Sequence, residues 1–268
     1  MYVSISTALA FPRKDDQNGY ENFEDRIRMI RQVGFDHVTL WWAEAEFDKQ
    51  SDQIKILDRY NVIADNAHLP YNRCNELWMP KGYDETYVKE TISYIKECSE
   101  CGIDTVVLHV STSKITPVYN INGIERIKKI VEAAEKYNVK IAFENLRMPK
   151  YLDYIMKNIN SEKVGICFDS GHNNYCYPAD SIIRKYKDKI FAIHLHDNFG
   201  RSDEHLIPFD GNINWDEITK AISECSYKNI SLEVHKYSTY DSITCEEFLE
   251  KSYSAAVKLK EIVIQAEK

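Results

Sequence analysis

The sequence contains no stretch rich in proline, glycine or serine, no low-complexity tract and no block of like charges. Such segments are typical of linkers and of disordered regions. None interrupts the 268 residues, and 44% of them are hydrophobic. We therefore expect one globular domain over residues 1–268 with a sizeable core.

An export signal and long apolar runs are also missing. Residues 1–16 lack the basic start and apolar run of a secretory signal, and no run is long enough to span a membrane. The seven cysteines are odd in number and irregularly spaced, which fits a reducing cytoplasm better than a disulfide framework. The expected protein is cytoplasmic and makes no contact with a membrane.

The sequence has fewer basic than acidic residues. It contains 34 Lys and Arg and 42 Asp and Glu, which gives a formal net charge of −8. The overall field of an acidic chain does not steer it to nucleic acid. Nucleic acid is therefore not expected as a partner.

The sequence does contain a regular alternation of strand patterns with amphipathic helix patterns. Strands are predicted at residues 2–7, 36–40, 62–67, 104–108, 138–143, 163–168, 190–196 and 229–232. Helices are predicted at residues 22–33, 52–60, 84–101, 123–137, 150–158, 179–186, 215–225 and 245–266. Eight strands alternating with eight helices at this length predict a single (β/α)8 TIM barrel, an α/β fold with a parallel sheet.

Polar residues occupy the ends of the last four predicted strands. Successive side chains of a strand face opposite sides, so the apolar set faces the helices and the small or polar set faces the barrel interior. The carboxyl-terminal rim, where such barrels carry their active sites, then gathers Glu144, Asp169, His194 and Glu233. Three buried carboxylates repel each other unless a cation lies among them. We therefore predict a site for Mn²⁺, Co²⁺ or Zn²⁺, with Mg²⁺ as an alternative, and no organic cofactor.

Histidines gather at the same rim. Seven of the eight lie at, or soon after, the predicted end of a strand: His68, His109, His172, His194, His196, His205 and His235. Asp197, Asp203 and Glu204 follow the seventh strand as well. Groups of this kind bind divalent metals or move protons, so we interpret them as further members of the site.

These residues lie in short motifs that resemble the xylose-isomerase-like barrel superfamily, which holds sugar isomerases and epimerases together with endonuclease IV. The matching motifs are HLPY at 68–71, LHVS at 108–111, FENL at 143–146, CFDSGH at 167–172, IHLHDN at 193–198, DEHLIPFDGNINW at 203–215 and SLEVH at 231–235. The resemblance implies a single metal held by Glu144, Asp169, His194 and Glu233, with the two glutamates as catalytic acid and base. It also implies a homo-oligomer.

Two functions are compatible with this resemblance. The first is metal-dependent isomerisation or epimerisation of a sugar, a sugar phosphate or a related keto sugar through an enediolate. The substrate would then contact His68, His109, His172 and His196, with Arg147 or Arg201 for a phosphate or carboxylate group. Trp41 or Trp42 would form a wall for the sugar ring, and we assign Trp42 and Arg201 to the pocket.

The second function is zinc-dependent cleavage at abasic DNA, as in endonuclease IV. The resemblance implies three zinc ions there, which would add His68, His109, His172, Asp203 and His205 to the four metal ligands. Such an enzyme must grip DNA with basic loops. The loop at residues 41–52 is acidic here, and Arg13 and Lys14 in the loop at 10–24 are accompanied by acidic residues. We therefore favour the sugar isomerase or epimerase.

Overall fold

The computed structural model describes residues 1–11, 22–112, 115–176 and 182–268. Most of the loop with Arg13 and Lys14 lies outside these ranges. One parallel sheet runs in the order β7-β6-β5-β4-β3-β2-β1-β8. Its strands are β1 (Val3–Ser6), β2 (His37–Trp41), β3 (Ile63–His68), β4 (Thr105–Leu108), β5 (Lys140–Glu144), β6 (Val164–Asp169), β7 (Ile190–His194) and β8 (Ile230–Leu232).

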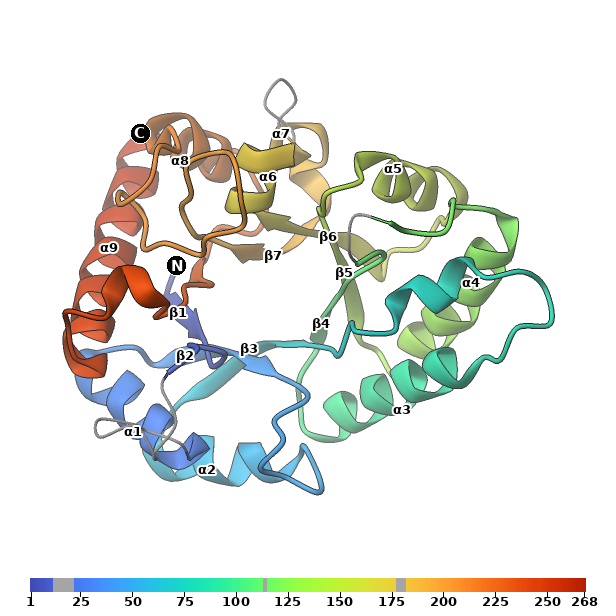
Figure 1. Ribbon diagram of the computed structural model, residues 1–268, viewed down its shortest axis with the longest axis horizontal. Helices are drawn as coiled ribbons and strands as arrows, with labels where there is room; N and C mark the ends of the chain where they lie inside the picture. Colours follow the sequence, from blue (N-terminus) through green and yellow to red (C-terminus); the bar gives the residue numbers. More distant parts are fainter. Residues whose placement is uncertain (12–21, 113–114, 177–181) are drawn as a thin grey trace.

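The two ends of the sheet meet at β7 and β8. Leu195 forms an isolated parallel bridge with Leu232, and its N–H donates to the carbonyl of Ser231 at 2.8 Å. The sheet therefore curls into a barrel, and Figure 1 shows the strands at the centre with helices around them. The predicted (β/α)8 barrel is confirmed.

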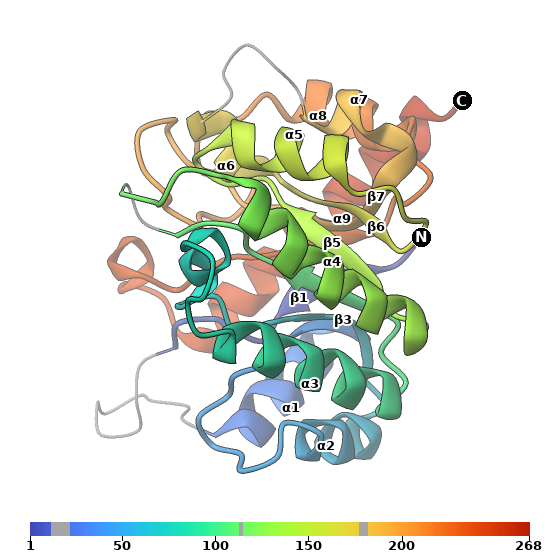
Figure 2. The ribbon, with the colours of Figure 1, turned by 90° about the vertical axis from the view of Figure 1, so that its right-hand side faces the viewer.

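Helices lie outside the strands, and α3, α4 and α5 cover one side of the barrel in Figure 2. The helices are α1 (Phe23–Val33), α2 (Asp52–Tyr60), α3 (Thr86–Glu100), α4 (Ile121–Lys136), α5 (Pro149–Asn158), α6 (Ser170–Cys176), α7 (Ile182–Lys185), α8 (Trp215–Ser223) and α9 (Cys245–Ala266). Short 3₁₀ turns add η1 (Cys74–Trp78), η2 (Lys187–Lys189) and η3 (Ser238–Tyr240). Among the described residues, no helix is both long and apolar enough to cross a membrane.

The region after β6 differs from the prediction of a helix at residues 179–186. Residues 177–181 lie outside the described ranges, α7 begins at Ile182, and a further helix, α6, follows β6 at once. The early start has a local cause: Asp169 Oδ1 accepts a hydrogen bond from the backbone N–H of His172 at 2.6 Å. A carboxylate in this position caps the first turn of a helix. As a result, His172 lies in the first turn, close to the end of β6.

The inside of the barrel is filled by small side chains, as the alternation predicts. Val107, Ala142, Cys167 and Ala192 form a separate buried cluster on β4 to β7. Across the barrel, the hydroxyl oxygens of Thr39 and Ser231 lie 3.1 Å apart. Two residues further along each strand, the same face presents polar groups. The layer of small residues therefore lies directly beneath the polar residues of the rim.

Candidate active site

Four side chains from β5, β6, β7 and the end of β8 meet at the carboxyl-terminal rim. Glu144, Asp169, His194 and Glu233 each offer one ligand atom, and these atoms all lie within 4.8 Å of one another. His194 Nδ1 lies 3.3 Å from Glu233 Oε2 and 3.7 Å from Glu144 Oε2. The sequence-predicted set of four is therefore assembled at one point.

Three of these four groups are buried and present polar atoms without a hydrogen bond. Glu144 is 1% exposed, and Asp169 and His194 are 0% exposed. Glu144 Oε1, Asp169 Oδ2 and both ring nitrogens of His194 make no hydrogen bond among the described residues. Leaving a buried polar atom unsatisfied costs about 1–3 kcal/mol. Converging oxygen and nitrogen lone pairs without donors fit a divalent cation, and this donor set suits Mn²⁺, Co²⁺, Zn²⁺ or Mg²⁺.

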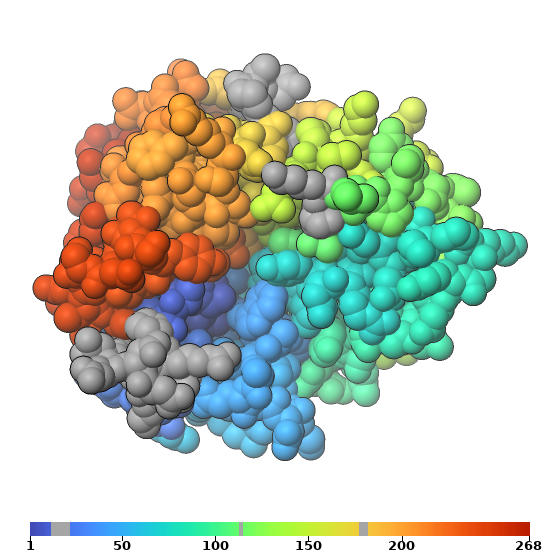
Figure 3. Space-filling model, viewed as in Figure 1, coloured from blue at the N-terminus to red at the C-terminus, as the bar shows by residue number. Residues whose placement is uncertain are grey.

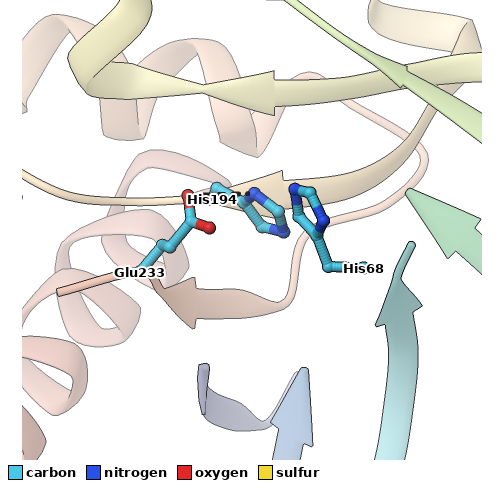
Figure 4. Close-up of side chains that lie close together, drawn as sticks. All are labelled: His68, His194 and Glu233. Carbon is cyan, nitrogen blue, oxygen red and sulfur yellow. Dashed lines mark ion pairs between the residues drawn. The ribbon is translucent and has the colours of Figure 1, made fainter. Parts of the chain in front are cut away.

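A second group shares Glu144 with the first. His68 ends β3, and His109 follows β4. Their Nε2 atoms lie 3.2 Å apart and 3.3 Å and 3.0 Å, respectively, from Glu144 Oε2. Figure 4 shows His68 and His194 facing each other, with Glu233 on the other side of His194. The two groups are thus contiguous.

A third group surrounds Asp203, in the loop after β7. Its Oδ2 lies 3.1 Å from His172 Nε2 and 3.3 Å from Arg147 Nη2. Its Oδ1 lies 3.4 Å from His205 Nε2 and 3.8 Å from His196 Nε2. Together with the two groups above, the fold brings all nine residues of the predicted multinuclear set to one rim.

Charge pairing sets the protonation of this rim. Burial alone would raise the pKa of Glu144, but the charge of His109 and the close approach of the His109, His172 and His68 rings hold that pKa well below its usual range. Burial likewise opposes the charged form of His205, yet its hydrogen bond to Asp203 and the charge of Glu233 raise the pKa of His205 to about 9. Burial first, and then the charge of His205, lower the pKa of His235 to about 3. Imidazole and carboxylate groups therefore balance each other here.

Backbone and side-chain hydrogen bonds hold the ligands in place. Asn145 Oδ1 accepts from the N–H of Asp169 at 2.7 Å, and its Nδ2 donates to the carbonyl of Asp169 at 2.9 Å. The hydroxyl of Ser170 donates to the carbonyl of His196 at 2.7 Å. The His196 ring stacks on that of His205 with 4.0 Å between centroids. Such supporting contacts fix ligand orientation at metal sites.

Asp197 does not belong to the site, although the sequence placed it there. It is fully buried, and its oxygens accept hydrogen bonds from the N–H groups of Phe209 and Ile213 and from the indole of Trp215, at 2.8–3.1 Å. Its carboxylate thus fixes the loop between β7 and α8. Glu204 likewise accepts from the N–H of Phe199 at 2.8 Å.

Two predicted substrate contacts are also placed elsewhere. Trp42 is 0% exposed and lies in the hydrophobic core, whereas the ring of Trp41 lies 5.3 Å from that of His68. The strand alternation explains this, because Trp41 ends β2 on its inward face. Arg201 is exposed, and among the described residues no hydrogen bond or ion pair joins it to the site. Tyr71, the last residue of the HLPY motif, stacks on His109 with 4.0 Å between ring centroids.

A cavity of about 150 Å³ adjoins these groups. It is lined by Tyr71, His109, Ser111, Thr112, Leu146, Arg147, His172 and Asp203. Figure 3 shows a hollow near the centre of the face seen in Figure 1, between the segments coloured orange and cyan. A substrate in this cavity would lie against the metal-ligand groups.

Comparison with known proteins agrees with this architecture. Residues 27–256 match the family described as xylose isomerase-like TIM barrel. The protein y4fM of Sinorhizobium fredii is 28% identical over 287 aligned positions, covering 92% of this chain and 91% of its own. Protein MJ1311 of Methanocaldococcus jannaschii is 29% identical and covers 77% and 75%, respectively.

Several solved structures share the whole fold. A D-tagatose 3-epimerase-like protein superposes with a TM-score of 0.78 at 24% identity, covering 99% of both chains. D-psicose 3-epimerase from Clostridium cellulolyticum H10, solved with D-tagatose, gives 0.78 at 14% identity, covering 98% of this chain and 99% of its own. The IOLI protein, solved with a zinc atom, gives 0.75 at 18% identity and covers 99% of both chains.

Proposed function

This chain belongs to the xylose isomerase-like TIM barrel family, and we propose that it is a divalent-metal-dependent isomerase or epimerase of a ketose or a related keto sugar. One observation carries the proposal. Two glutamates, Glu144 and Glu233, stand with Asp169 and His194 around one point, and unsatisfied lone pairs converge on it. Two carboxylates beside an acidified C–H are what proton removal and return require.

The proton-transfer groups are the two glutamates. Glu233 follows β8 and its side chain is 14% exposed, whereas Glu144 ends β5 and its side chain is 1% exposed. Burial opposes the charged form of Glu233, but the charge of His194, whose Nδ1 lies 3.3 Å from Glu233 Oε2, holds its pKa well below the usual range. The glutamate that acts as the base must be ionised, and the one that returns a proton must carry that proton when the carbon is reprotonated. A bound divalent metal would polarise a carbonyl and stabilise the negative charge that develops on it.

In this mechanism one glutamate takes the proton from the carbon beside the carbonyl, and the other returns a proton. Return on the opposite face of the carbon gives an epimer, and transfer between neighbouring carbons gives an isomer. His109 and His172 line the cavity and would hold substrate hydroxyls. His196 is 0% exposed and stacked on His205, so it supports Asp169, 3.1 Å from its Nε2, rather than the sugar.

The similar structures support a ketose as the substrate class. One is named as D-tagatose 3-epimerase-like, and another is an epimerase solved with D-tagatose. The zinc atom of the IOLI protein supports a divalent metal in this chain as well. Trp41 beside His68 replaces Trp42 as the aromatic wall that we propose for the sugar.

A second candidate function is phosphodiester cleavage at abasic DNA. The specific observation that favours it is the gathering of all nine residues that three zinc ions would need, including the group around Asp203. Overall charge weighs against it, because DNA binding draws most of its affinity from contacts between cationic side chains and phosphates. A net charge of −8 offers no such field.

Metal content and turnover decide between the two. Elemental mass spectrometry on protein purified without added metal or chelator gives the number of ions per chain. Conversion of a panel of ketoses and ketose phosphates, followed by chromatography of epimers and isomers, tests the proposed function. Cleavage of an abasic duplex without conversion of any ketose would replace it with the second function.

A further inference from the structure

We propose that Arg147 forms an anion subsite beside the metal-ligand groups, so that the sugar substrate carries a phosphate or carboxylate group. This inference rests on the proposed function and names its substrate class. Arg147 lies three residues beyond Glu144, between β5 and the start of α5 at Pro149. It lines the same cavity as His109 and His172. A ligand that reaches the metal-ligand groups therefore passes or contacts its guanidinium.

Arg147 supplies the permanent positive charge of this cavity. Among the described lining residues, no other arginine and no lysine is present. A guanidinium has five N–H donors in a planar fork, which matches the oxygens of a phosphate or carboxylate in pairs. The described contacts use one of these donors, from Nη2 to Asp203 Oδ2 at 3.3 Å. The remaining edge of the fork is available to a ligand.

Asp203 orients this arginine without neutralising it. The Asp203 carboxylate also faces His172 Nε2 at 3.1 Å and His205 Nε2 at 3.4 Å. With Arg147 Nη2 and His196 Nε2, one negative charge is thus shared by four nitrogen partners. The Arg147 side chain is 37% exposed and Asp203 is 20% exposed, so their pairing is open to solvent on one side. An incoming anion can bind the open edge of the Arg147 guanidinium while Asp203 retains its contacts with His172 and His205.

Other residues of the lining carry hydroxyl groups. Tyr71, Ser111 and Thr112 line the cavity with Arg147. Thr112 is fixed by Asn75, whose side chain accepts from its N–H and donates to its carbonyl, each at 2.9 Å. Hydroxyl donors and a guanidinium around one small space suit several acceptor oxygens. Because the whole chain carries a net charge of −8, an anionic ligand needs such a local cation.

The test uses ligands that bind without reacting. Ribitol, ribitol 5-phosphate and ribonate lack a keto group, and they distinguish a neutral polyol from a phosphate and from a carboxylate. Isothermal titration of the metal-loaded protein should show one of the two anions binding at least about 30-fold tighter than ribitol, on the scale of charge-assisted hydrogen bonds. Arg147→Gln should remove that preference, and Arg147→Lys should restore part of it. Metal content of the variants, measured in parallel, should stay at the wild-type value.

Arg201→Gln is the matched control, because it removes the same charge from an exposed position without contacts to the site. It should leave all three affinities unchanged. Equal affinity for ribitol and both anions, or an unchanged preference in Arg147→Gln, would overturn the subsite. If the preference is present but no ketose or ketose phosphate is converted, the anion subsite stands and the proposed isomerase fails. If ketoses are converted but no anion is preferred, the proposed isomerase stands and the anion subsite fails.

Discussion

The two ends of the barrel treat acidic groups in opposite ways. At the amino-terminal end, a register shift between β2 and β3 sets Asp65 between residues paired with Val38 and Thr39. Its Oδ1 accepts from the hydroxyl of Tyr2, and its Oδ2 accepts from that of Tyr227 at 2.6 Å. Tyr2 in turn stacks on His37 at 3.8 Å between ring centroids. Every oxygen of this carboxylate has a donor.

At the carboxyl-terminal end, Asp169 Oδ2, Glu144 Oε1 and both ring nitrogens of His194 make no hydrogen bond among the described residues. The residue types are similar at both ends. At one end the chain supplies hydrogen-bond partners for the acidic group, and at the other end several polar atoms have none. Unsatisfied buried groups are rare in folded proteins and mark places that serve function. The contrast predicts that substitutions at the carboxyl-terminal end, called the upper end below, affect activity. Substitutions at the amino-terminal end, called the lower end, should affect stability.

The largest expected effect comes from the two glutamates. Glu144→Gln and Glu233→Gln should each lower kcat by about 10³-fold or more, because each variant loses a proton-transfer group. Both should remain folded, since these two carboxylates accept no backbone hydrogen bond in the described part of the chain. Steady-state kinetics on the converted ketose, with circular dichroism as the check on folding, measures this. Near-normal turnover in either variant would falsify the two-carboxylate mechanism.

Asp65→Asn is the matched control at the lower end. It makes the same change from carboxylate to amide, but far from the lone pairs of the rim. Its kcat should stay within about twofold of wild type, because surface and structural changes away from the site leave the reacting geometry intact. A loss of activity as large as that of Glu233→Gln would mean that the two ends are coupled.

The next largest effect should be an increase in the free energy of unfolding when a metal binds at the upper end. A ligand that binds only the folded protein adds about 2.7 kcal/mol to the free energy of unfolding at 100 times its dissociation constant. Denaturant titrations with Zn²⁺ or Mn²⁺ and with chelator should differ by this amount in the wild type. Asp169→Asn should lose most of the difference, since it removes a converging ligand, and Asp65→Asn should retain all of it. An equal gain in Asp169→Asn would place the metal elsewhere.

A smaller effect is expected where the backbone makes room for a site histidine. A Cβ on Gly171 would lie 1.9 Å from the His196 ring, so Gly171→Ala must displace that ring from Asp169 and His205. We expect kcat/KM to fall by about 10-fold to 100-fold, as misplaced supporting groups do at catalytic sites. In the background of His196→Ala, the same change should cost little, because the clashing ring is gone. Additive losses would show that Gly171 acts through another contact.

Parts of this site were predictable from the sequence because strand alternation is a local property. Glu144, Asp169 and His194 each follow a run in which apolar and small residues alternate, so their direction could be read without a structure. The capping of α6 by Asp169 was not predicted, since the same carboxylate was interpreted only as a metal ligand. For Trp41 and Trp42, two adjacent aromatic residues gave no indication of which one faces the axis.

Long-range pairing was the other limit. Arg147 and Asp203 are 56 residues apart, and only the closed barrel brings them to one cavity. The sequence therefore offered both Arg147 and Arg201, and our prediction assigned Arg201 to the pocket. The register shift that sets Asp65 between two tyrosines depends on how β3 pairs with β2, which no pattern within β3 alone encodes.

The smallest effect should come from the satisfied acid at the lower end. Tyr227→Phe removes the shorter of two hydrogen bonds to Asp65 Oδ2 and leaves that oxygen with the Asn66 side-chain amide at 3.2 Å, which should lower the free energy of unfolding by about 1 kcal/mol. Denaturant unfolding measures this change, and kcat and metal content should equal those of the wild type. Adding Asp65→Asn should reduce the cost, because an amide no longer needs two donors. If Tyr227→Phe instead lowered activity while stability stayed constant, the lower end would be part of the working site, and satisfaction of hydrogen bonds would not separate structural from functional acids in this barrel.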